Sequence, residues 1–170
     1  KTITTSILSL EHIEELHRSS LYAVELSPLV QAAYQEFLPQ AKSQSQELTL
    51  KLPDEPVHVL GDTTLLAQVV TNLLENAVKY TQDGGCIEVR LKKTTDAVIF
   101  EVEDNGCGVP EKHQEKIFQP FVRLKNNNEV AGTGLGLYLV KSIVLRHDGC
   151  VIFHSVPEQG SVFGFSLPLH

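Results

Sequence analysis

A long amphipathic helix is the feature that most constrains how this chain can fold. Apolar residues recur at helical spacing from Leu65 to Val78. Asp62 stands where a side chain caps the first turn of such a helix, and Gly84-Gly85 forms the stop. A helix with one apolar face has to bury that face against a second layer. The segment is therefore predicted to be the central helix of a layered domain.

Two pairs of predicted strands supply the second layer. Residues 86–91 and 97–102 carry β-branched side chains on alternating positions around a polar turn, which predicts a strand pair. Residues 151–155 and 161–167 predict a final hairpin, with Pro157 to Gly160 as its turn. The predicted fold class is α+β: a two-layer sandwich of a mixed, mainly antiparallel sheet with helices on one face.

The first third of the chain adds one helix and two short strands. Ser27-Pro28 predicts an N-cap and a first-turn proline, which open a helix that runs to about residue 42. Residues 48–52 and 57–60 are short extended segments, and they predict a small edge hairpin.

A long connection precedes the last predicted helix. Residues 105–133 are rich in Gly, Asn and Pro and predict a loop, with a short helical turn near residues 113–117. Residues 134–146 predict a helix that Gly149 ends. A loop of this length is usually functional.

Length, composition and charge exclude several classes of protein. At 170 residues and 42% hydrophobic content, the chain fits one globular domain. Apolar runs stay below the roughly 18 to 20 residues that cross a bilayer, so a soluble segment without membrane contact is predicted. A net charge of -7 argues against nucleic-acid binding, which needs a basic face. Three widely spaced cysteines predict no disulfide framework, which indicates a reducing compartment. A cytoplasmic location is predicted for this segment, and membrane anchoring of the parent protein stays open.

One face of the central helix is polar. Its residues fall at offsets 0, 4, 7 and 8 and lie on one side of a helix: Asn72, Asn76, Lys79 and Tyr80. Taken alone, such a face can simply be solvated. Asparagine is a poor helix former, however. Two asparagines one turn apart beside a lysine offer carbonyl oxygens for Mg²⁺ and an ammonium group for phosphate.

A turn with two glycines follows the predicted strand 97–102. The segment from Asp104 to Pro110 is either an ordinary strand-exit turn or part of a binding site. In a binding site, Asp104 would be a buried carboxylate that accepts a hydrogen bond from the N6 amine of adenine. Gly106 and Gly108 would let a flat base lie against the backbone.

A second glycine-rich segment, Gly132 to Leu137, comes directly before a helix. Its amides and the helix N-terminus can hold phosphate oxygens, and Gly134 and Gly136 would permit close approach. The segment lacks the Lys-Ser/Thr ending of a P-loop, and the dinucleotide fingerprint requires a preceding strand that is missing here. The sequence therefore disfavours both of those nucleotide-binding folds.

In the order in which they occur along the chain, these segments resemble the sequence motifs, called boxes, of the catalytic, ATP-binding domain of sensor histidine kinases. This domain belongs to the GHKL superfamily, with gyrase, Hsp90 and MutL. Residues 72–80 match the N box, 104–108 the G1 box, 118–121 the F box and 132–136 the G2 box. Gly160-Ser161 is similar to the weaker third glycine motif. The resemblance covers nearly the whole chain and implies ATP and Mg²⁺ as cofactors.

The resemblance implies a role for the residues of each box. Asn76 would coordinate Mg²⁺, and Asn72 and Lys79 would meet the phosphates directly or through water. Tyr80 would pack near the nucleotide, and Asp104 would fix adenine.

The resemblance also implies a mobile ATP lid over residues 122–133, hinged by Gly132 and held partly by Phe118 and Phe121. The full implied cofactor-binding set is Asn72, Asn76, Lys79, Tyr80, Asp104, Gly106, Gly108, Val109, Ile117, Phe118, Phe121, Arg123, Lys125, Gly132, Thr133, Gly134, Leu135, Gly136, Leu137 and Ser161.

Position 72 separates the branches of the superfamily. ATP-hydrolysing relatives carry a glutamate one turn before the magnesium asparagine, where it activates water, whereas this chain carries Asn72. An amide cannot act as that base, so the resemblance favours transfer of the γ-phosphate to a protein histidine. The implied catalytic residues are Asn72, Lys79 and, as the nearest carboxylate, Glu75. A GHKL ATPase that drives conformational change and a non-catalytic, nucleotide-gated interaction module remain as alternatives.

The first 22 residues differ from the rest. Residues 1–22 resemble the end of a dimerisation helix and its linker, and residues 23–170 the catalytic domain. His12 and His17 do not match the phosphoacceptor motif. The implied partners are therefore a dimerisation and phosphoacceptor hairpin of the parent protein, itself a homodimer, and the receiver domain of a response regulator.

Overall fold

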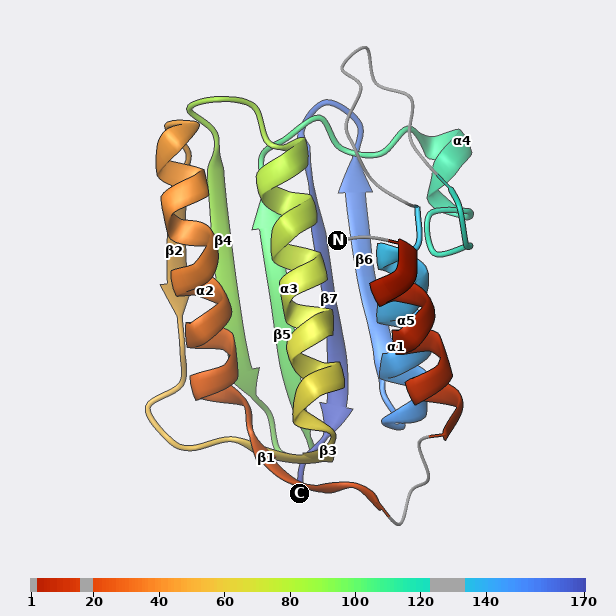
Figure 1. Ribbon diagram of the computed structural model, residues 1–170. Helices are drawn as coiled ribbons and strands as arrows, with labels where there is room; N and C mark the ends of the chain where they lie inside the picture. Colours follow the sequence, from red (N-terminus) through yellow and green to blue (C-terminus); the bar gives the residue numbers. More distant parts are fainter. Residues whose placement is uncertain (1–2, 16–19, 123–133) are drawn as a thin grey trace.

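The computed structural model describes residues 3–15, 20–122 and 134–170. The elements, in chain order, are α1 (Ile3–Glu15), β1 (Tyr22–Glu25), α2 (Leu26–Ser43), β2 (Glu47–Lys51), β3 (His58–Gly61), α3 (Thr63–Tyr80), β4 (Cys86–Lys93), β5 (Ala97–Asp104), α4 (Glu111–Gln114), α5 (Gly136–Arg146), β6 (Cys150–Val156) and β7 (Gly160–Pro168). Helices α2, α3 and α5 lie side by side over one face of a five-stranded sheet (Figure 1). This two-layer arrangement confirms the predicted α+β fold class.

The main sheet has the strand order β2-β4-β5-β7-β6. Strand β2 runs parallel to β4, and the other neighbouring pairs are antiparallel, so the sheet is mixed and mainly antiparallel as predicted. A parallel pair needs a crossover connection, and the connection from β2 to β4 contains α3. The crossover therefore carries the central helix onto the face of the sheet.

The predicted hairpin of residues 48–52 with 57–60 is wrong. Strand β2 joins the main sheet, whereas β3 pairs with β1 in a separate two-stranded sheet. Pro53 and Pro56 lie between β2 and β3, and proline has no backbone N–H to donate to a ladder. Strand β1 had no predicted counterpart, because four residues are too few to show a clear alternation.

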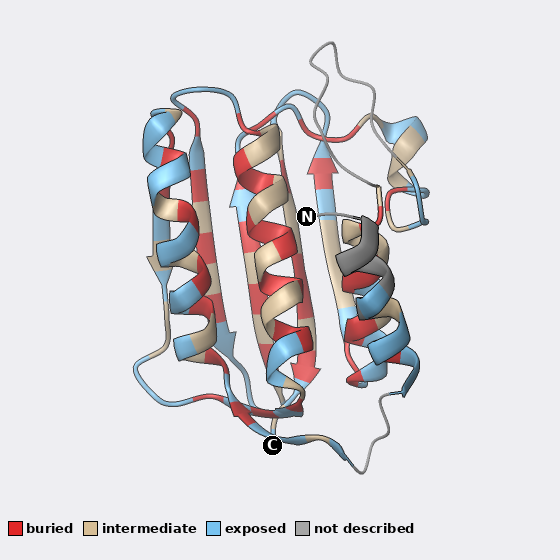
Figure 2. Ribbon diagram, in the orientation of Figure 1, coloured by how far each residue is buried: buried red, intermediate tan, exposed pale blue. Residues whose placement is uncertain are grey.

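The central helix forms as predicted. The Asp62 carboxylate caps it by accepting a hydrogen bond from the backbone N–H of Leu65 at 2.9 Å. Its apolar face is buried: Leu65, Leu66, Val69, Val70, Leu73, Leu74, Ala77 and Val78. Figure 2 shows this buried face together with the buried residues of the strands behind it. In the described part of the chain, no helix combines the length and apolarity of a membrane span.

The start of α2 differs from the prediction by one residue. The helix begins at Leu26 with Glu25 as its N-cap, so Ser27 is not the cap, although Pro28 does lie in the first turn. The backbone N–H of Leu26 donates to the carbonyl of Val57 at 2.9 Å. This tertiary hydrogen bond satisfies the N–H of the first helical residue, and the helix can therefore begin before Ser27.

The start of α5 also differs from the prediction, whereas its last residue, Arg146, is as predicted. The helix begins at Gly136 rather than at residue 134, and its last turn is closed by Asp148, whose φ of 59° is left-handed. Gly149 is required for another reason: a Cβ there would lie 2.4 Å from the backbone oxygen of Ser166 in β7. Gly149 therefore permits close contact between the helix end and the sheet.

His147 joins the end of α5 to the start of α3. Its ring is buried; Nδ1 donates to the carbonyl of Ile143 at 2.7 Å, and Nε2 accepts from the backbone N–H of Asp62 at 3.1 Å. These two bonds require the neutral ring. Burial lowers the pKa of His147; the hydrogen bond to Ile143 and the nearby carboxylates of Asp62 and Asp148 only partly oppose that effect.

We expect acid to weaken this connection. Because the folded pKa of His147 lies below its unfolded value of 6.5, its stabilisation is present above that pH and is lost as the pH falls through the folded pKa. His147→Gln can still accept a hydrogen bond but does not titrate, so its free energy of unfolding should depend less on pH in this range. Urea unfolding at about pH 5 and about pH 7.5 measures the effect. His154→Gln, at an exposed histidine on β6, is the control. An unchanged pH dependence of the unfolding free energy in His147→Gln would contradict this role of His147.

Candidate functional site

The sequence motifs meet at one end of the helix layer. The C-terminus of α3, the end of β5, the N-terminus of α5 and the start of β7 lie together, with α4 beside them (upper right of Figure 1). The ladder places Asp104 opposite Ser161. The Nδ2 atom of Asn72 lies 3.4 Å from the carbonyl oxygen of Gly136. The fold thus brings the N-box, G1-box, G2-box and third-glycine residues to one site.

The polar face of α3 is not simply solvated. Asn72 is 5% exposed and donates from Nδ2 to Gly136, so it links α3 to the first turn of α5. Asn76, Lys79 and Tyr80 are half-buried, and the Lys79 ammonium lies 5.6 Å from the centre of the Tyr80 ring. Glu75 is also half-buried, one residue away from Asn76. This face offers amide and ammonium groups at the edge of the site.

Asp104 is a buried carboxylate at the end of β5. It accepts hydrogen bonds from the backbone N–H groups of Gly106, at 2.9 Å, and Ser161. Burial raises the pKa of Asp104, the two backbone bonds work against that rise, and the nearby Glu103 charge adds to it. An acceptor held this firmly in a nearly dry position suits a ligand that brings its own N–H donor.

The F-box residues have different environments. Phe118 packs edge-on against Phe153 and Phe163, with ring centres 6.0 and 6.4 Å away. Phe121 is 70% exposed, and its backbone N–H donates to the carbonyl of Gly134 at 2.9 Å. That bond ties together the two ends of the segment predicted as a lid. Ile117 is buried beside Phe118 in sequence.

The remaining predicted site residues divide into two groups. Val109 and Leu135 are buried, Gly108 has a left-handed backbone with φ of 65°, and Leu137 is half-buried. Four others, Arg123, Lys125, Gly132 and Thr133, lie outside the described residues. The short helix preceding them is α4, Glu111–Gln114, slightly earlier than the predicted turn at 113–117.

The residues present fit a magnesium ion bound mainly through its ligand. Within the described ranges, no cluster of three or more His, Cys, Asp or Glu side chains is arranged to hold a metal. Mg²⁺ keeps an octahedral shell and often binds through one or two protein oxygens plus substrate phosphates. The half-buried amide of Asn76 can supply one such oxygen.

Three polar residues of the site were missed by sequence reasoning. The Ser155 hydroxyl accepts from the backbone N–H of Val109 at 2.8 Å, and Gln114 Nε2 donates to the carbonyl of Val109 at 3.0 Å. Gln46 Nε2 donates to the carbonyls of Val78 and Thr81, at 2.9 and 2.8 Å, and so caps the C-terminus of α3. No local pattern marks these residues, since each acts on a segment distant in the sequence.

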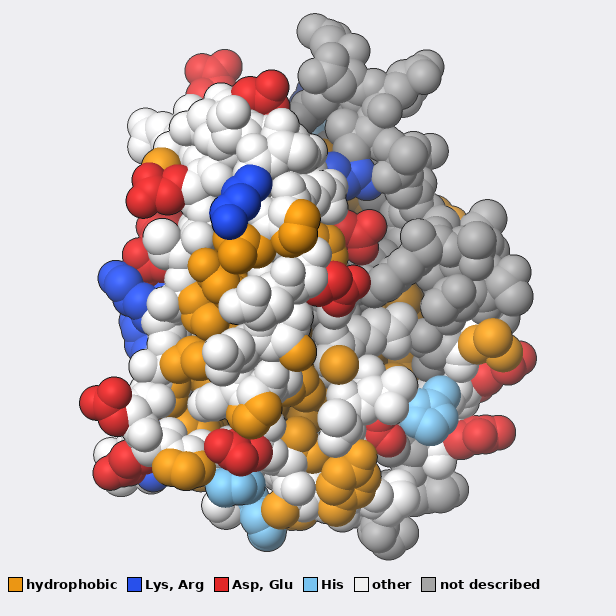
Figure 3. Space-filling view, turned by 60° about the vertical axis from the view of Figure 1, so that its left-hand side comes forward, with side chains coloured by type: hydrophobic (Ala, Val, Ile, Leu, Met, Phe, Trp, Pro, Cys, Tyr) orange, Lys and Arg blue, Asp and Glu red, His pale blue; other side chains and the backbone are white. Residues whose placement is uncertain are grey.

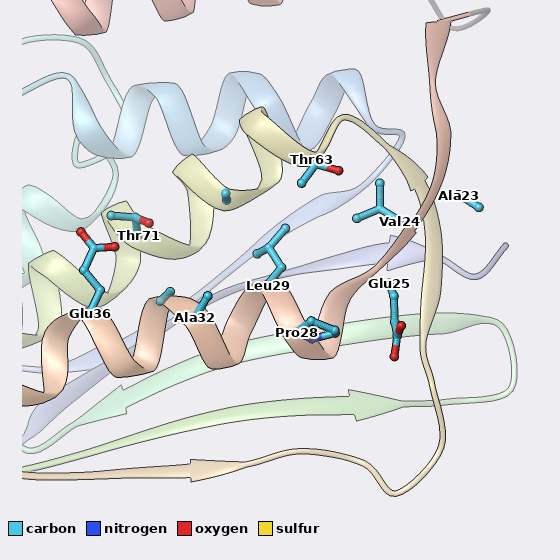
Figure 4. Close-up of a pocket in the computed structure, with 11 residues that line it drawn as sticks. Ala23, Val24, Glu25, Pro28, Leu29, Ala32, Glu36, Thr63 and Thr71 are labelled. Atoms are coloured by element: carbon cyan, nitrogen blue, oxygen red, sulfur yellow. The ribbon is translucent and has the colours of Figure 1, made fainter.

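A groove of about 520 Å³ lies elsewhere, between α2, α3 and β1. Figure 3 shows hydrophobic side chains along this side of the molecule, and Figure 4 shows the groove itself. Its lining is mostly apolar or small: Ala23, Val24, Glu25, Pro28, Leu29, Ala32, Ala33, Glu36, Thr63, Ala67 and Thr71. The charged groups of this lining are acidic, so the groove does not suit a nucleotide, whose phosphates are negative.

A protein-family model matches most of the chain, including the segments that form the site described above. Residues 61–170 match the model described as histidine kinase-, DNA gyrase B-, and HSP90-like ATPase. The adaptive-response sensory kinase SasA of Rippkaea orientalis is 41% identical over 145 residues, which are 85% of this chain and 37% of that protein. The alginate biosynthesis sensor protein KinB of Pseudomonas aeruginosa is 36% identical over 154 residues, which are 91% of this chain and 26% of that protein. The chain thus spans well under half the length of these relatives.

Solved structures give the same result. The catalytic domain of histidine kinase ThkA superposes with a TM-score of 0.77 at 29% identity, over 88% of this chain and 95% of that one. Full-length ShkA in complex with AMPPNP superposes with a TM-score of 0.81 at 26% identity, over 97% of this chain and 35% of that one. The resemblance read from the motifs is confirmed by these matches.

Proposed function

The chain belongs to the family of histidine kinase-, DNA gyrase B- and HSP90-like ATPases, as the ATP-binding catalytic domain of a sensor histidine kinase, and we propose that it presents the γ-phosphate of Mg-ATP to a histidine. That histidine lies on a helical hairpin of the homodimeric parent protein. The phosphoryl group later passes to an aspartate in a response-regulator receiver domain. The domain works on the cytoplasmic side, where ATP is available.

The observation that carries the proposal is the buried carboxylate of Asp104. It already accepts two backbone hydrogen bonds, and the end of β5 on which it stands lies near the C-terminus of α3 and the N-terminus of α5 (Figure 1). A carboxylate here accepts a hydrogen bond from the exocyclic amine of adenine. The base then lies beside Gly106 and Gly108, and the phosphates reach toward the first turn of α5.

The residues of α3 orient the triphosphate. Asn76 holds the cation through its amide oxygen, and Lys79 and Asn72 contact phosphate oxygens. When bound, Mg²⁺ neutralises charge on the β- and γ-phosphates. An imidazole nitrogen forms the new bond to phosphorus, the bond to the β,γ-bridging oxygen breaks, and ADP leaves. The protein acts by positioning and electrostatics.

Asn72 favours kinase over ATPase activity. Its amide is buried and contacts the carbonyl of Gly136 through Nδ2. An amide cannot take a proton from water, so no base stands at the position where hydrolysing relatives would need one. Glu75 is the nearest carboxylate, but it has a different helical angle from Asn72 and Asn76, so its catalytic role stays a prediction.

The decisive experiment joins this chain to the phosphoacceptor hairpin of its parent and supplies γ-labelled ATP. We expect label on a hairpin histidine, in an acid-labile and alkali-stable form, and little multiple-turnover phosphate release from the chain alone. Rapid phosphate release without the hairpin would favour the ATPase alternative. Normal ATP binding with an unlabelled hairpin would favour the nucleotide-gated module.

A further inference from the structure

Three buried polar side chains form a row across the sheet under the proposed base site. The ladder pairs Asp104 of β5 with Ser161 of β7, and Ser161 in turn with Ser155 of β6. Their exposed fractions are 9%, 7% and 8%. Because directly paired residues point to the same face of a sheet, the three side chains lie next to one another on the helix-covered face. Asp104 and Ser161 have an expected role in the site, whereas Ser155 has none so far.

The Ser155 hydroxyl has three hydrogen-bond partners but only one proton to donate. Its oxygen lies 2.8 Å from the backbone nitrogen of Val109, 3.1 Å from the carbonyl oxygen of Gly160 and 2.9 Å from Oγ of Ser161. Val109 can only donate and Gly160 can only accept. All three contacts are satisfied together in one arrangement: Ser155 donates to Gly160 and accepts from both Val109 and Ser161.

This arrangement fixes the proton of Ser161. If the Ser161 hydroxyl donates to Ser155, only its lone pairs remain for a ligand. The neighbouring Asp104 carboxylate, when ionised, is also an acceptor only. These two side chains then offer the proposed base site acceptors and no donor. Such an edge matches the amine at C6 of adenine and opposes the carbonyl oxygen at C6 of hypoxanthine or guanine.

We propose that Ser155 is a positioning residue that sets the base specificity of this site by holding the Ser161 hydroxyl as an acceptor. The inference rests on the proposed nucleotide function. Ser155 acts through Ser161 and through Val109, the residue that follows the G1 box. Gln114 connects the same two segments by donating to the carbonyls of Val109 and Ser155, at 3.0 and 3.3 Å. Ser155 itself does not touch the base.

The test compares ATP with inosine triphosphate, which differs from ATP in carrying a carbonyl at C6 and a proton on N1. Ser155→Ala frees the Ser161 hydroxyl to rotate and donate, so the preference for ATP over inosine triphosphate should fall about tenfold, the value of one net hydrogen bond. Ser155→Thr keeps the hydroxyl and should retain the preference. Ser166→Ala removes a hydroxyl farther along β7, opposite Cys150, and is the matched control. Calorimetric titration of each nucleotide with Mg²⁺ gives the ratio.

Each outcome has a defined meaning. A lowered ratio in Ser155→Ala alone supports the assignment. An unchanged ratio, or an equal loss for both nucleotides, would overturn it, because a merely structural role weakens both alike. Failure of Ser155→Ala to fold, seen by circular dichroism, would also overturn it. If the unaltered chain binds neither nucleotide, the proposed function fails, which is distinct from failure of this inference.

Discussion

Replacing Asp104 with asparagine is expected to lower the affinity for Mg-ATP about 100-fold, the larger end of what a hydrogen bond to a charged group contributes. The substitution keeps the shape of the side chain but exchanges one acceptor oxygen for an NH₂ donor. That donor would face either the N–H of Ser161 or the amine of adenine. Two donors cannot satisfy each other, so the loss should exceed that of one missing contact. Asp104→Ala removes both acceptor oxygens and should abolish detectable binding.

The same substitution should remove an electrostatic cost of folding at neutral pH, which opposes the loss of the hydrogen bond that the carboxylate accepts from the Ser161 N–H. Burial raises the pKa of Asp104, so the folded state favours the neutral carboxyl more than the unfolded state does. The corresponding stabilisation is present in acid and is lost as the pH rises through the folded pKa. At neutral pH the ionised group therefore opposes folding, and an uncharged amide removes that opposition. Thermal unfolding at neutral pH measures this effect.

Acidification of the unaltered chain provides a second measurement. ATP affinity should begin to fall at a higher pH than an ordinary aspartate, with a pKa near 3.8, would allow. Asp96→Asn, at an exposed carboxylate in the turn before β5, is the control and should leave affinity unchanged. Undiminished ATP binding by Asp104→Asn would falsify the adenine assignment.

Gly106→Ala and Gly136→Ala should separate a glycine needed by the fold from a glycine needed by the ligand. A Cβ on Gly106 would lie 2.5 Å from the carbonyl oxygen of Tyr80 and 2.9 Å from Oδ1 of Asp104. To relieve these contacts, the C-terminal end of α3 has to move away from the residues of the G1 box. We expect destabilisation of about 1–3 kcal/mol, as for overpacked cores, together with loss of ATP binding.

Gly136→Ala should behave in the opposite way. No described atom lies within 4 Å of a Cβ at Gly136, the first residue of α5, outside its own helix and chain neighbours. Alanine is the better helix former by up to about 1 kcal/mol, so the free energy of unfolding should stay the same or rise. ATP affinity should nevertheless fall, because the new methyl group occupies the space at the first turn of α5 in which the phosphates are proposed to bind. Equal ATP affinity in this variant would remove Gly136 from the site.

Much of the fold could be predicted because its elements carry strong local signals. The α3 helix combines a period with a cap at Asp62, although it ends at Tyr80, before the predicted stop at Gly84-Gly85; strands β4 to β7 show alternation with identifiable turns. The errors arose where distant segments decide the outcome. Leu26 is bonded to Val57, and β2 is paired with β4, so neither the exact start of α2 nor the partner of β2 could be read locally.

The candidate site shows the same division. Residue types in the boxes indicate a nucleotide, and Asn72 in place of a carboxylate indicates transfer rather than hydrolysis, because proton-accepting chemistry depends on the side chain itself. The sequence by itself therefore determined the family, and it predicts the residues that would contact the nucleotide. The tertiary structure alone decided that Asp104 is buried, that Asn72 reaches Gly136 and that Ser155 lies beside Ser161. Burial and hydrogen-bond pairing depend on what the sheet brings next to each group, and the ladder pairs residues that are distant in the sequence, as with Asp104 and Ser161, which are 57 positions apart.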